Sequence, residues 1–576
     1  MKKNEVAGIL EEIGILLEIK EDNPFKSRAY INGARIVLNL EEDLETLVSE
    51  NRLTAISGIG QALSGKITEY VRTGKLQYYE ELKASIPAGL MEMLRVPGLG
   101  PKKVRILYEK LGITNLRSLE YACKENRLVE LPGFGVKTQE KVLAGIEYLK
   151  TFQGQYYYAE ALGLAWTALE PLRQHPGVTE ASLAGSIRRA KEVVGDIDLV
   201  AAAENTAEIT GFFSELPQVR EVVSCGETMT SVLLDSGIRA DLRVVKPREY
   251  PYALHHFTGS KEHNTALRRL AKEKGLKINE YGLFSGEELI PCHTEKELYA
   301  ALGLNYIPPE LRENTGEIEA AQHGPLPELL KVGDIKGIFH LHTTYSDGSN
   351  SIAEMVEEAL RYGYEYIGIS DHSQTAAYAG GLKAADIRRQ HEEIRRLREV
   401  YPKIAICFGI ESDIRFDGAL DYPDDLLADF DFVIASVHSQ FRMTEEDMTK
   451  RIVKAMSHPA VTMLGHATGR ILLAREGYPV NIEVILKTAL EHGVIMELNA
   501  SPARLDLDWR HLKKAKEMGV LISINPDAHR IEEINDINYG IAVARKGWLA
   551  KEDVFNCYPV NWVSEYLAKK QRNARN

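Results

Sequence analysis

The spacing of apolar positions changes along the chain and predicts a different structure for each part. Residues 1–50 have the spacing of amphipathic helices, and the helix expected within 23–40 has two faces. Its buried candidates are Phe25, Ala29, Ile36 and Leu38, and its solvent-facing ones are Lys26, Arg28 and Arg35. From residue 156 to 245 the pattern becomes mixed α/β, with a clearly alternating strand at 237–245 (GIRADLRVV).

Beyond residue 335, short apolar runs alternate with helical patterns. The runs are GIFHLH, YIGISDH, IAICFGIE, DFVIASVH, VTMLGH, VIMELN and VLISINPDAH, and SIAEMVEEALRYG is typical of the helices between them. This alternation predicts a barrel of parallel strands. The stretch 305–335, rich in proline, glycine and acidic residues, is the clearest domain boundary.

Composition limits the number of domains and the class of protein. A length of 576 residues suggests three to five domains. No apolar run approaches the roughly 20 residues that span a bilayer. Five cysteines without a CxxC spacing indicate reduced thiols in a cytoplasmic protein. The net charge of −13 argues mildly against nucleic-acid binding, but residues 1–150 are close to neutral.

An apolar-Gly-apolar-Gly pattern recurs three times in the first 150 residues. Its glycine pairs are Gly58 and Gly60, Gly98 and Gly100, and Gly133 and Gly135, with Lys66, Lys102, Lys103 and Lys137 just beyond them. Glycines permit a tight turn, and the next helix presents free N–H groups to a phosphate. The pattern resembles the helix-hairpin-helix module, which grips the DNA backbone without reading sequence.

The segment 185–198 (GSIRRAKEVVGDID) has the features of a nucleotidyltransferase site. The Gly185-Ser186 turn lets backbone N–H groups approach an anion, and Arg188 and Arg189 add positive charge. Asp196 and Asp198 share one face of a strand, and Asp241 offers a third carboxylate on another strand. Such carboxylates suit two Mg²⁺ ions that clamp the oxygens of phosphoryl transfer.

A second turn, Gly259-Ser260, precedes a basic helix. Asn264, Arg268 and Arg269 fall on neighbouring turns of that helix. An ordinary charged surface helix is the alternative reading.

Nearly every strand of the expected barrel ends in a residue that can bind metal. The candidates are His340, His342, Asp347, His372, Glu411, His438, His466, Asp527 and His529. Active sites of such barrels lie at the carboxyl ends of the strands, and nine ligands suit two or three ions. Mn²⁺, Zn²⁺ and Fe²⁺ all fit, Glu411 is the expected bridging carboxylate, and the implied chemistry is metal-assisted hydrolysis of a phosphoester.

Two families are recognisable from these residues. Residues 1–318 resemble family X DNA polymerases of the DNA polymerase beta type, and residues 333–576 resemble a PHP (polymerase and histidinol phosphatase) domain. The combination is similar to bacterial PolX. The resemblance implies a multidomain α/β fold: an all-α helix-hairpin-helix part, a nucleotidyltransferase palm with a thumb, and a distorted PHP (β/α)7 barrel.

The resemblance also implies domain boundaries. They are 1–84 for a lyase-like helical domain, 85–152 for a helix-hairpin-helix subdomain, 153–246 for the palm, 247–318 for the thumb, 319–334 for a linker and 335–576 for the PHP domain.

Roles follow from the resemblance, residue by residue. Asp196, Asp198 and Asp241 match the catalytic carboxylates, which hold Mg²⁺ or Mn²⁺. Gly185, Ser186, Arg189 and Gly195 match the triphosphate site, and His256, Phe257, Gly259 and Ser260 match the turn beside the sugar. Asn264 and Arg268 match readers of the nascent base pair, and the nine barrel residues match the PHP ligand set. Lys66 matches the Schiff-base lysine of the lyase domain, with Lys26 and Tyr30 in support.

Three positions depart from the beta-type pattern. His256 replaces a tyrosine, which affects sugar discrimination, and Lys261 replaces an acid, which strengthens nucleotide binding. Ala62 replaces a supporting lysine, which weakens the case for lyase activity.

The implied function is a monomeric polymerase that fills short gaps during base excision repair. Its partners are gapped or primer-template DNA and deoxynucleoside triphosphates, with no membrane. The PHP domain adds a 3′–5′ exonuclease, and AP-endonuclease or 3′-end cleaning are further options. One alternative is a PHP nuclease that uses the N-terminal half only as a DNA-binding platform. Another is a phosphatase of a small metabolite such as histidinol phosphate, which the three hairpins argue against.

Overall fold

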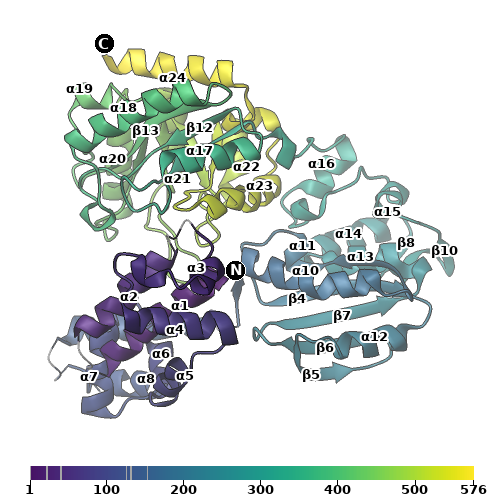
Figure 1. Cartoon of the computed structure of the whole chain (residues 1–576). Helices are drawn as coiled ribbons and strands as arrows, with labels where there is room; N and C mark the ends of the chain where they lie inside the picture. Colours follow the sequence, from purple (N-terminus) through teal and green to yellow (C-terminus); the bar gives the residue numbers. More distant parts are fainter. Residues whose placement is uncertain are drawn as a thin grey trace. The chain divides into compact units, whose positions relative to one another are not determined.

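The computed structural model describes residues 2–20, 24–38, 40, 42–124, 126–129, 131, 133–151 and 154–575. The chain divides into two compact units, Met1–Gln153 and Gly154–Asn576. Figure 1 follows the chain from purple at the N-terminus to yellow at the C-terminus. None of the helices in the described part of the chain combines the length and the apolarity that a membrane crossing requires.

In its described residues the first unit consists of helices joined by turns and loops, with no strand. Its helices are α1 (Lys2–Ile19), α2 (Pro24–Leu38), α3 (Leu44–Ser49), α4 (Gln61–Thr73), α5 (Gln77–Ala84), α6 (Ala88–Met93), α7 (Pro101–Leu111), α8 (Leu116–Lys124) and α9 (Val136–Thr151). Apolar residues from these helices form one shared core.

The prediction for α2 is confirmed for its solvent face, where Lys26, Arg28 and Arg35 are exposed, but wrong for most of its buried face, of which only Ile36 packs against the core. Phe25 is 78% exposed, Leu38 is 36% exposed, and the core residues are instead Tyr30, Ala34 and Val37. Those three lie four and three residues apart, which places them on one stripe of the helix. Packing against α1 selects this stripe, and the apolar residues outside it remain at the surface.

The second unit begins with a mixed sheet. Its elements are β1 (Tyr156–Tyr157), α10 (Tyr158–Gln174), β2 (Val178–Leu183), α11 (Gly185–Arg188), β3 (Val193–Val194), β4 (Asp196–Ala203), α12 (Thr206–Ser214), β5 (Val219–Cys225), β6 (Met229–Leu234) and β7 (Arg239–Val245). The main sheet has the order β2-β4-β7-β6-β5, and β4 and β7 are parallel. Figure 1 shows β4, β7, β6 and β5 side by side.

Both faces of β4 in this sheet are covered. Ile197, Leu199 and Ala201 of β4 pack into the core that contains α10 and α12. The alternate residues Val200 and Ala202 pack on the other face, against α13. Asp196 and Asp198 have the same parity as Val200, so their carboxylates lie on the α13 face.

A smaller region follows the sheet. It contains α13 (Tyr250–Thr258), α14 (Lys261–Glu273), β8 (Leu276–Asn279), β9 (Gly282–Ser285), β10 (Glu288–Ile290), α15 (Glu295–Ala301) and α16 (Glu317–His323). The strands β8, β9 and β10 form an antiparallel sheet.

The predicted parallel barrel is confirmed. Its elements are β11 (Gly337–Leu341), α17 (Ile352–Arg361), β12 (Tyr366–Ile369), α18 (Ala384–Val400), β13 (Ala405–Asp413), α19 (Asp424–Leu427), β14 (Phe432–Ser436), α20 (Glu445–Met456), β15 (Met463–Leu464), α21 (Ile482–His492), β16 (Ile495–Asn499), α22 (Trp509–Met518), β17 (Ile522–Asn525), α23 (Ile537–Lys546) and α24 (Val560–Arg575). The strands pair in sequence order, and a bridge from Leu341 to Ala528 brings the two edges together.

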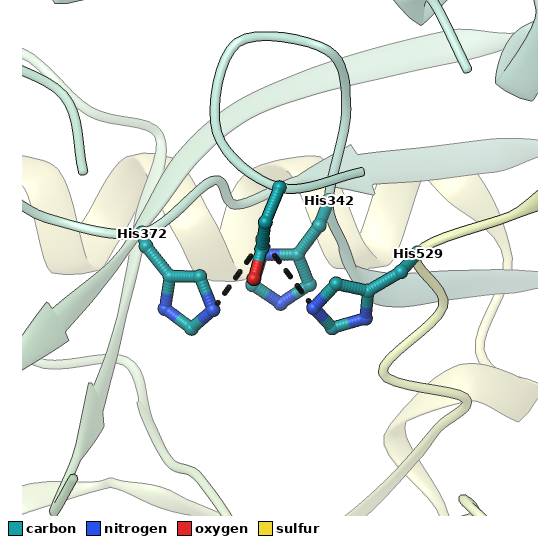
Figure 2. A group of neighbouring side chains, drawn as sticks. His342, His372 and His529 are labelled. Carbon is teal, nitrogen blue, oxygen red and sulfur yellow. Dashed lines mark ion pairs between the residues drawn. The ribbon is translucent and has the colours of Figure 1, made fainter. Parts of the chain in front are cut away.

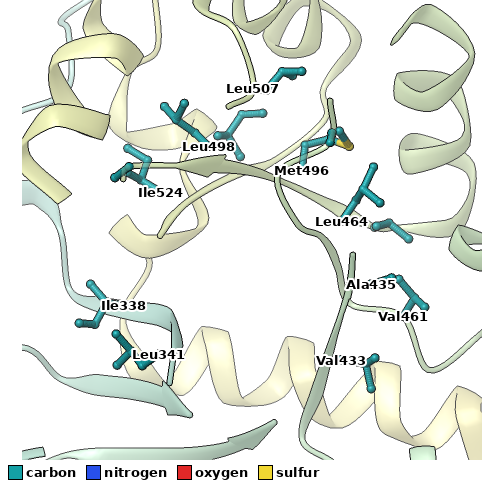
Figure 3. Packing of buried hydrophobic residues seen from close by; sticks show 14 of the residues in the cluster. Ile338, Leu341, Val433, Ala435, Val461, Leu464, Met496, Leu498, Leu507 and Ile524 are labelled. Atoms are coloured by element: carbon teal, nitrogen blue, oxygen red, sulfur yellow. The ribbon is translucent and has the colours of Figure 1, made fainter. Parts of the chain in front are cut away.

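Two layers of apolar residues support the barrel. Figure 3 shows one of them, to which β11, β14, β15, β16 and β17 all contribute. In the other layer the rings of Phe339 and Phe432 lie 5.0 Å apart although β11 and β14 are not neighbours. These rings therefore meet inside the barrel and fill it below the ends of the strands.

Candidate active sites

The three hairpins of the first unit share one backbone conformation. Each begins with a left-handed glycine, at φ 91° for Gly58, 87° for Gly98 and 82° for Gly133. The amide of the next residue donates to a carbonyl three residues back, from Ile59 to Ile56, Leu99 to Val96 and Phe134 to Leu131. The helices α4, α7 and α9 begin immediately after Gly60, Gly100 and Gly135. The unbonded amides of each first turn are therefore available to an anion.

The lysines near these turns differ in their surroundings. Lys102 is exposed in the first turn of α7, whereas Lys103 donates from Nζ to the Gly98 carbonyl at 3.1 Å. Lys66 Nζ lies 4.6 Å from the centroid of the Tyr78 ring, and Lys26 Nζ lies 5.5 Å from it. Tyr30 stacks on the same ring. Tyr78, which the sequence analysis missed, is thus the centre of this group.

In the palm sheet the predicted carboxylates lie on adjacent strands. Asp198 pairs in register with Asp241 across the parallel strands β4 and β7. Arg239 lies between the outer carboxylates, with Nη2 3.2 Å from Asp196 and Nε 3.4 Å from Asp241. Ser231 donates a hydrogen bond to Asp241.

Electrostatics favour a cation at these carboxylates. Burial, together with the charges of Asp196 and Asp241, raises the pKa of Asp198 to about 7. A cation beside Asp198 would reverse that shift, because it favours the ionised form. The donor set of oxygen atoms fits Mg²⁺ or Mn²⁺.

A pocket of about 460 Å³ adjoins the carboxylates. It is lined by Gly185, Ser186, Arg189, Asp196, Asp198, His256, Phe257, Gly259, Ser260, Lys261, Asn264 and Arg268. Every residue predicted for nucleotide binding is in this set except Gly195, which lies exposed before β4. The buried Ser186 hydroxyl makes no hydrogen bond within the described part of the chain, so it can serve an anion.

The two arginines at the end of α11 have different partners. Arg189 donates from Nε to Glu313 at 3.0 Å and from Nη1 to the Thr258 carbonyl, at the edge of the pocket. Arg188 instead forms an ion pair with Glu295 at 2.7 Å and donates to Thr258. The expectation that Arg188 grips a phosphate is therefore not supported, because Glu295 holds it away from the pocket.

Contacts from α14 and β7 hold His256 and Phe257 of the pocket in place. Asn264 of α14 donates from Nδ2 to the His256 carbonyl at 2.7 Å. Arg243 of β7 lies over the Phe257 ring, with its guanidinium carbon 5.0 Å from the centroid. Burial lowers the pKa of His256, so this side chain is neutral near neutral pH.

At the carboxyl ends of the barrel strands, the predicted ligands gather into four groups. They are His342, Asp347, His372 and His529; His340, His466 and Asp527; His340, His342 and Glu411; and His372, Glu411 and His438. Within each group the candidate ligand atoms lie within 4.8 Å of one another. Figure 2 shows the imidazoles of His342, His372 and His529 converging on one point. The four groups contain all nine predicted residues and no others.

Glu411 lies at the centre of the cluster, as expected for a bridging carboxylate. Its Oε1 is 3.2 Å from Nε2 of both His340 and His438 and 3.0 Å from Nε2 of His466, and its Oε2 is 2.8 Å from Nδ1 of His372. Although burial raises the pKa of Glu411, the surrounding histidines hold it well below its ordinary value. Burial lowers the pKa of His342 to about 3, which leaves a neutral imidazole suited to metal binding.

The residues fit a group of divalent cations. The buried atoms Nδ1 of His342 and Nδ1 of His466 have no hydrogen-bond partner among the described residues. His340, His466 and Asp527 also adopt positive φ angles of 63°, 22° and 55°. Strained backbone of this kind is concentrated at functional sites, and here it aims the side chains inward.

Two carboxylates behind the ligands were missed by the sequence analysis. Glu497 accepts from Nδ1 of His340 at 2.5 Å and from the His466 amide at 2.6 Å, and Asp413 accepts from Nδ1 of His438. Such partners fix the orientation of a ligating histidine. The sequence held a signal for Glu497, because it is the only charged residue in the apolar run VIMELN and a buried charge needs a partner.

Family models match four parts of the chain. A helix-hairpin-helix domain matches residues 1–76, a SAM-like helix-hairpin-helix tandem 90–147, a DNA polymerase beta thumb 253–313 and a PHP domain 339–501. The matched ranges coincide with the hairpins of the first unit, the region around α13 and α14, and the barrel.

Curated relatives agree with this order of parts. A probable phosphatase from Thermoanaerobacter sp. (strain X514) is 31% identical over 250 residues, which cover 40% of this chain and 94% of that protein. The DNA polymerase/3′-5′ exonuclease PolX of Bacillus subtilis (strain 168) is 40% identical over 573 residues, which cover 99% of this chain and 100% of that protein. The chain combines the hairpins, the pocket beside the carboxylates and the metal-binding barrel, and its similarity to this relative covers almost its whole length. The chain therefore belongs to the PolX family of DNA polymerases with 3′–5′ exonuclease activity.

Proposed function

We propose that this chain fills short gaps in DNA during repair of the base excision type, and that its barrel removes nucleotides from 3′ ends. The observation that carries the proposal is the in-register pair of Asp198 and Asp241 at the pocket of Ser186 and Arg189. Carboxylates beside an anion-binding turn suit the transfer of a nucleotide from a triphosphate to a primer end.

In the palm, each group of pocket residues has a separate task. Ser186 and Arg189 would hold the triphosphate, His256 and Phe257 would lie against the sugar, and Asn264 and Arg268 would contact the new base pair. Asp196, Asp198 and Asp241 would hold Mg²⁺ or Mn²⁺, which supplies charge stabilisation to the attacking and leaving oxygens. Lys261 adds positive charge at the mouth of the same pocket.

In the barrel, the nine ligands would hold two or three Mn²⁺, Zn²⁺ or Fe ions, which supply Lewis-acid activation for phosphodiester hydrolysis. Glu497 and Asp413 orient His340 and His438 for this task. AP-endonuclease and 3′-end cleaning would use the same site. The hairpins would grip the backbone of gapped DNA, and the protein would act as a monomer.

A lyase role for Lys66 stays a prediction. Its surroundings of Lys26, Tyr30 and Tyr78 place a second amine and two aromatic rings beside it.

The test is primer extension on a duplex with a one-nucleotide gap, with Mg²⁺ and then Mn²⁺. Wild type should fill the gap, Asp198→Ala should degrade the primer without extending it, and His340→Ala should extend it without degradation. The matched controls are Asp235→Ala, an exposed palm carboxylate, and His458→Ala, a barrel histidine outside the cluster. Both controls should behave as wild type.

Two results would favour other functions. If wild type only degrades DNA under every metal condition, the first half of the chain is a binding platform for a nuclease. If it ignores DNA but hydrolyses a small phosphate monoester, the likeness of the barrel to probable phosphatases gives the function instead.

A further inference from the structure

A lysine of the barrel that belongs to none of the groups of candidate metal ligands is buried. Lys546 is the last residue of α23 and is 1% exposed. Its ammonium donates to the carbonyl of Arg189 at 3.0 Å and pairs with Glu313 at 2.6 Å. A lysine at a helix end ordinarily faces solvent or its own last carbonyls, so this long-range placement needs a reason.

The contacts of Lys546 converge on the polymerase pocket. Glu313 uses a single oxygen, Oε1, to accept from both Lys546 Nζ and Arg189 Nε. Arg189 is thus held at two points, its carbonyl by Lys546 directly and its guanidinium through Glu313. The other branch of that guanidinium bonds the Thr258 carbonyl, which fixes it at the edge of the pocket.

Charge balance gives Lys546 a second effect. Burial lowers the pKa of Lys546, and the neighbouring Glu313 opposes that effect. With all three groups ionised, Lys546, Glu313 and Arg189 carry one net positive charge next to the pocket. Without Lys546 the remaining pair is neutral, because Glu313 then cancels Arg189 alone. A neutral pair attracts a polyanionic triphosphate less strongly than a group with net positive charge.

Other contacts join the barrel to the palm independently of Lys546. Glu192 lies 3.7 Å from Arg470 and 3.5 Å from Arg510, and the Tyr157 hydroxyl donates to the Leu472 carbonyl at 3.0 Å. Substitution of Lys546 alone therefore leaves the two parts in contact.

We propose that Lys546, although it belongs to the nuclease barrel, is a positioning residue of the polymerase reaction. It orients Arg189 and supplies the charge that lets Arg189 attract the incoming triphosphate. This inference rests on the proposed role of Arg189 in nucleotide binding.

The test compares full-length wild type with Lys546→Met in gap filling at varied dNTP concentration. KM for dNTP should rise about tenfold, as for loss of a hydrogen bond to a charged group, with a smaller change in kcat. Exonuclease activity on a single-stranded oligonucleotide should be unchanged. The control Lys516→Met removes a barrel lysine that pairs with Asp553 at 2.7 Å, and it should change neither activity.

A double-mutant cycle separates positioning from general damage. In an Arg189→Met background, Lys546→Met should add less than about twofold to KM, because its route to the nucleotide is already lost. Lys546→Gln keeps a donor without the charge, and it serves as the second variant if Lys546→Met does not fold. A KM within about twofold of wild type for the folded variants, or full additivity with Arg189→Met, would overturn the inference.

The same data separate this inference from the proposed function. If Arg189→Met leaves the KM for dNTP unchanged, the proposed role of Arg189 is wrong, and the inference falls with it. If Arg189→Met raises KM and the Lys546 variants do not, only the inference is wrong.

Discussion

At residue scale, the close approach of Gly185 to Asp198 limits what the palm site tolerates. A Cβ atom on Gly185 would lie 1.8 Å from Oδ2 of Asp198, and the residue has a left-handed φ of 55°. No side chain fits there unless the carboxylate moves. The glycine is therefore required by the position of Asp198 as well as by the turn.

We expect Gly185→Ala to lower the rate of gap filling about 100-fold, since a displacement of roughly 1 Å at a reacting group has that effect. The exonuclease should be retained. Gly163→Ala in α10 is the matched control, because a Cβ there meets no atom within 4 Å. Gap filling by Gly185→Ala at the wild-type rate would show that Asp198 needs no fixed position.

A second prediction at residue scale concerns the ionisation of Asp198. Its folded pKa of about 7 lies above the value of an unfolded aspartate, so the native state binds this proton more tightly. Its contribution to stability is present below pH 4 and is lost as the pH rises to 7. Asp198→Asn removes this titration. As the pH rises from 5 to 8 in the absence of metal, the unfolding free energy of wild type should therefore fall by about 3 kcal/mol relative to that of Asp198→Asn.

Denaturant unfolding in chelator at several pH values measures this difference. Asp235→Asn, an exposed substitution in the same sheet region, is the control and should parallel wild type. Parallel curves for Asp198→Asn and wild type would mean that the pKa of Asp198 is not raised.

At the scale of single elements, the helices after the hairpins present both amides and lysines. Lys102 is exposed in the first turn of α7, whereas Lys103 is tied back to Gly98. An exposed lysine beside free amides is placed to meet a backbone phosphate.

Lys102→Gln should weaken binding to gapped DNA equally for all sequences. The slope of log affinity against log salt should fall by about one, as for a single lost phosphate contact. Lys110→Gln, exposed near the other end of α7, is the control and should keep the wild-type slope. An unchanged slope for Lys102→Gln would mean that α7 does not meet the backbone.

At the scale of the whole molecule, the barrel ligands tie together most of its strands. They lie on or directly after β11, β12, β13, β14, β15 and β17. An ion bound to this set therefore stabilises the closed barrel and not one loop. The palm carboxylates, in contrast, lie on two strands only.

Each Mn²⁺ ion bound at a free concentration of 100 times its dissociation constant should stabilise the protein by about 2.7 kcal/mol, and chelation should reverse the effect. Thermal melting with and without Mn²⁺ measures it. Glu411→Gln should abolish the part of the stabilisation that comes from ions in the barrel, and Glu446→Gln on the exposed side of α20 should keep all of it. Stabilisation that survives Glu411→Gln but disappears in Asp198→Asn would place the effect in the palm.

The sequence by itself determined the features that depend on spacing within one element. Glycine pairs predicted the hairpins, alternation predicted β4 and β7, and ligands at strand ends predicted a cluster that the barrel assembles from all nine residues. These patterns depend only on residue spacing within one element, so they can be read without knowing which other elements pack against it.

Only the tertiary structure decided which elements meet. Packing against α1 chose the buried face of α2, Glu295 captured Arg188, and the folded barrel brought Glu497 behind His340. The contact of Lys546 with Arg189 joins residues 357 positions apart. No periodicity along the chain records such a contact, because it exists only once distant elements pack together and exclude water from the charges between them.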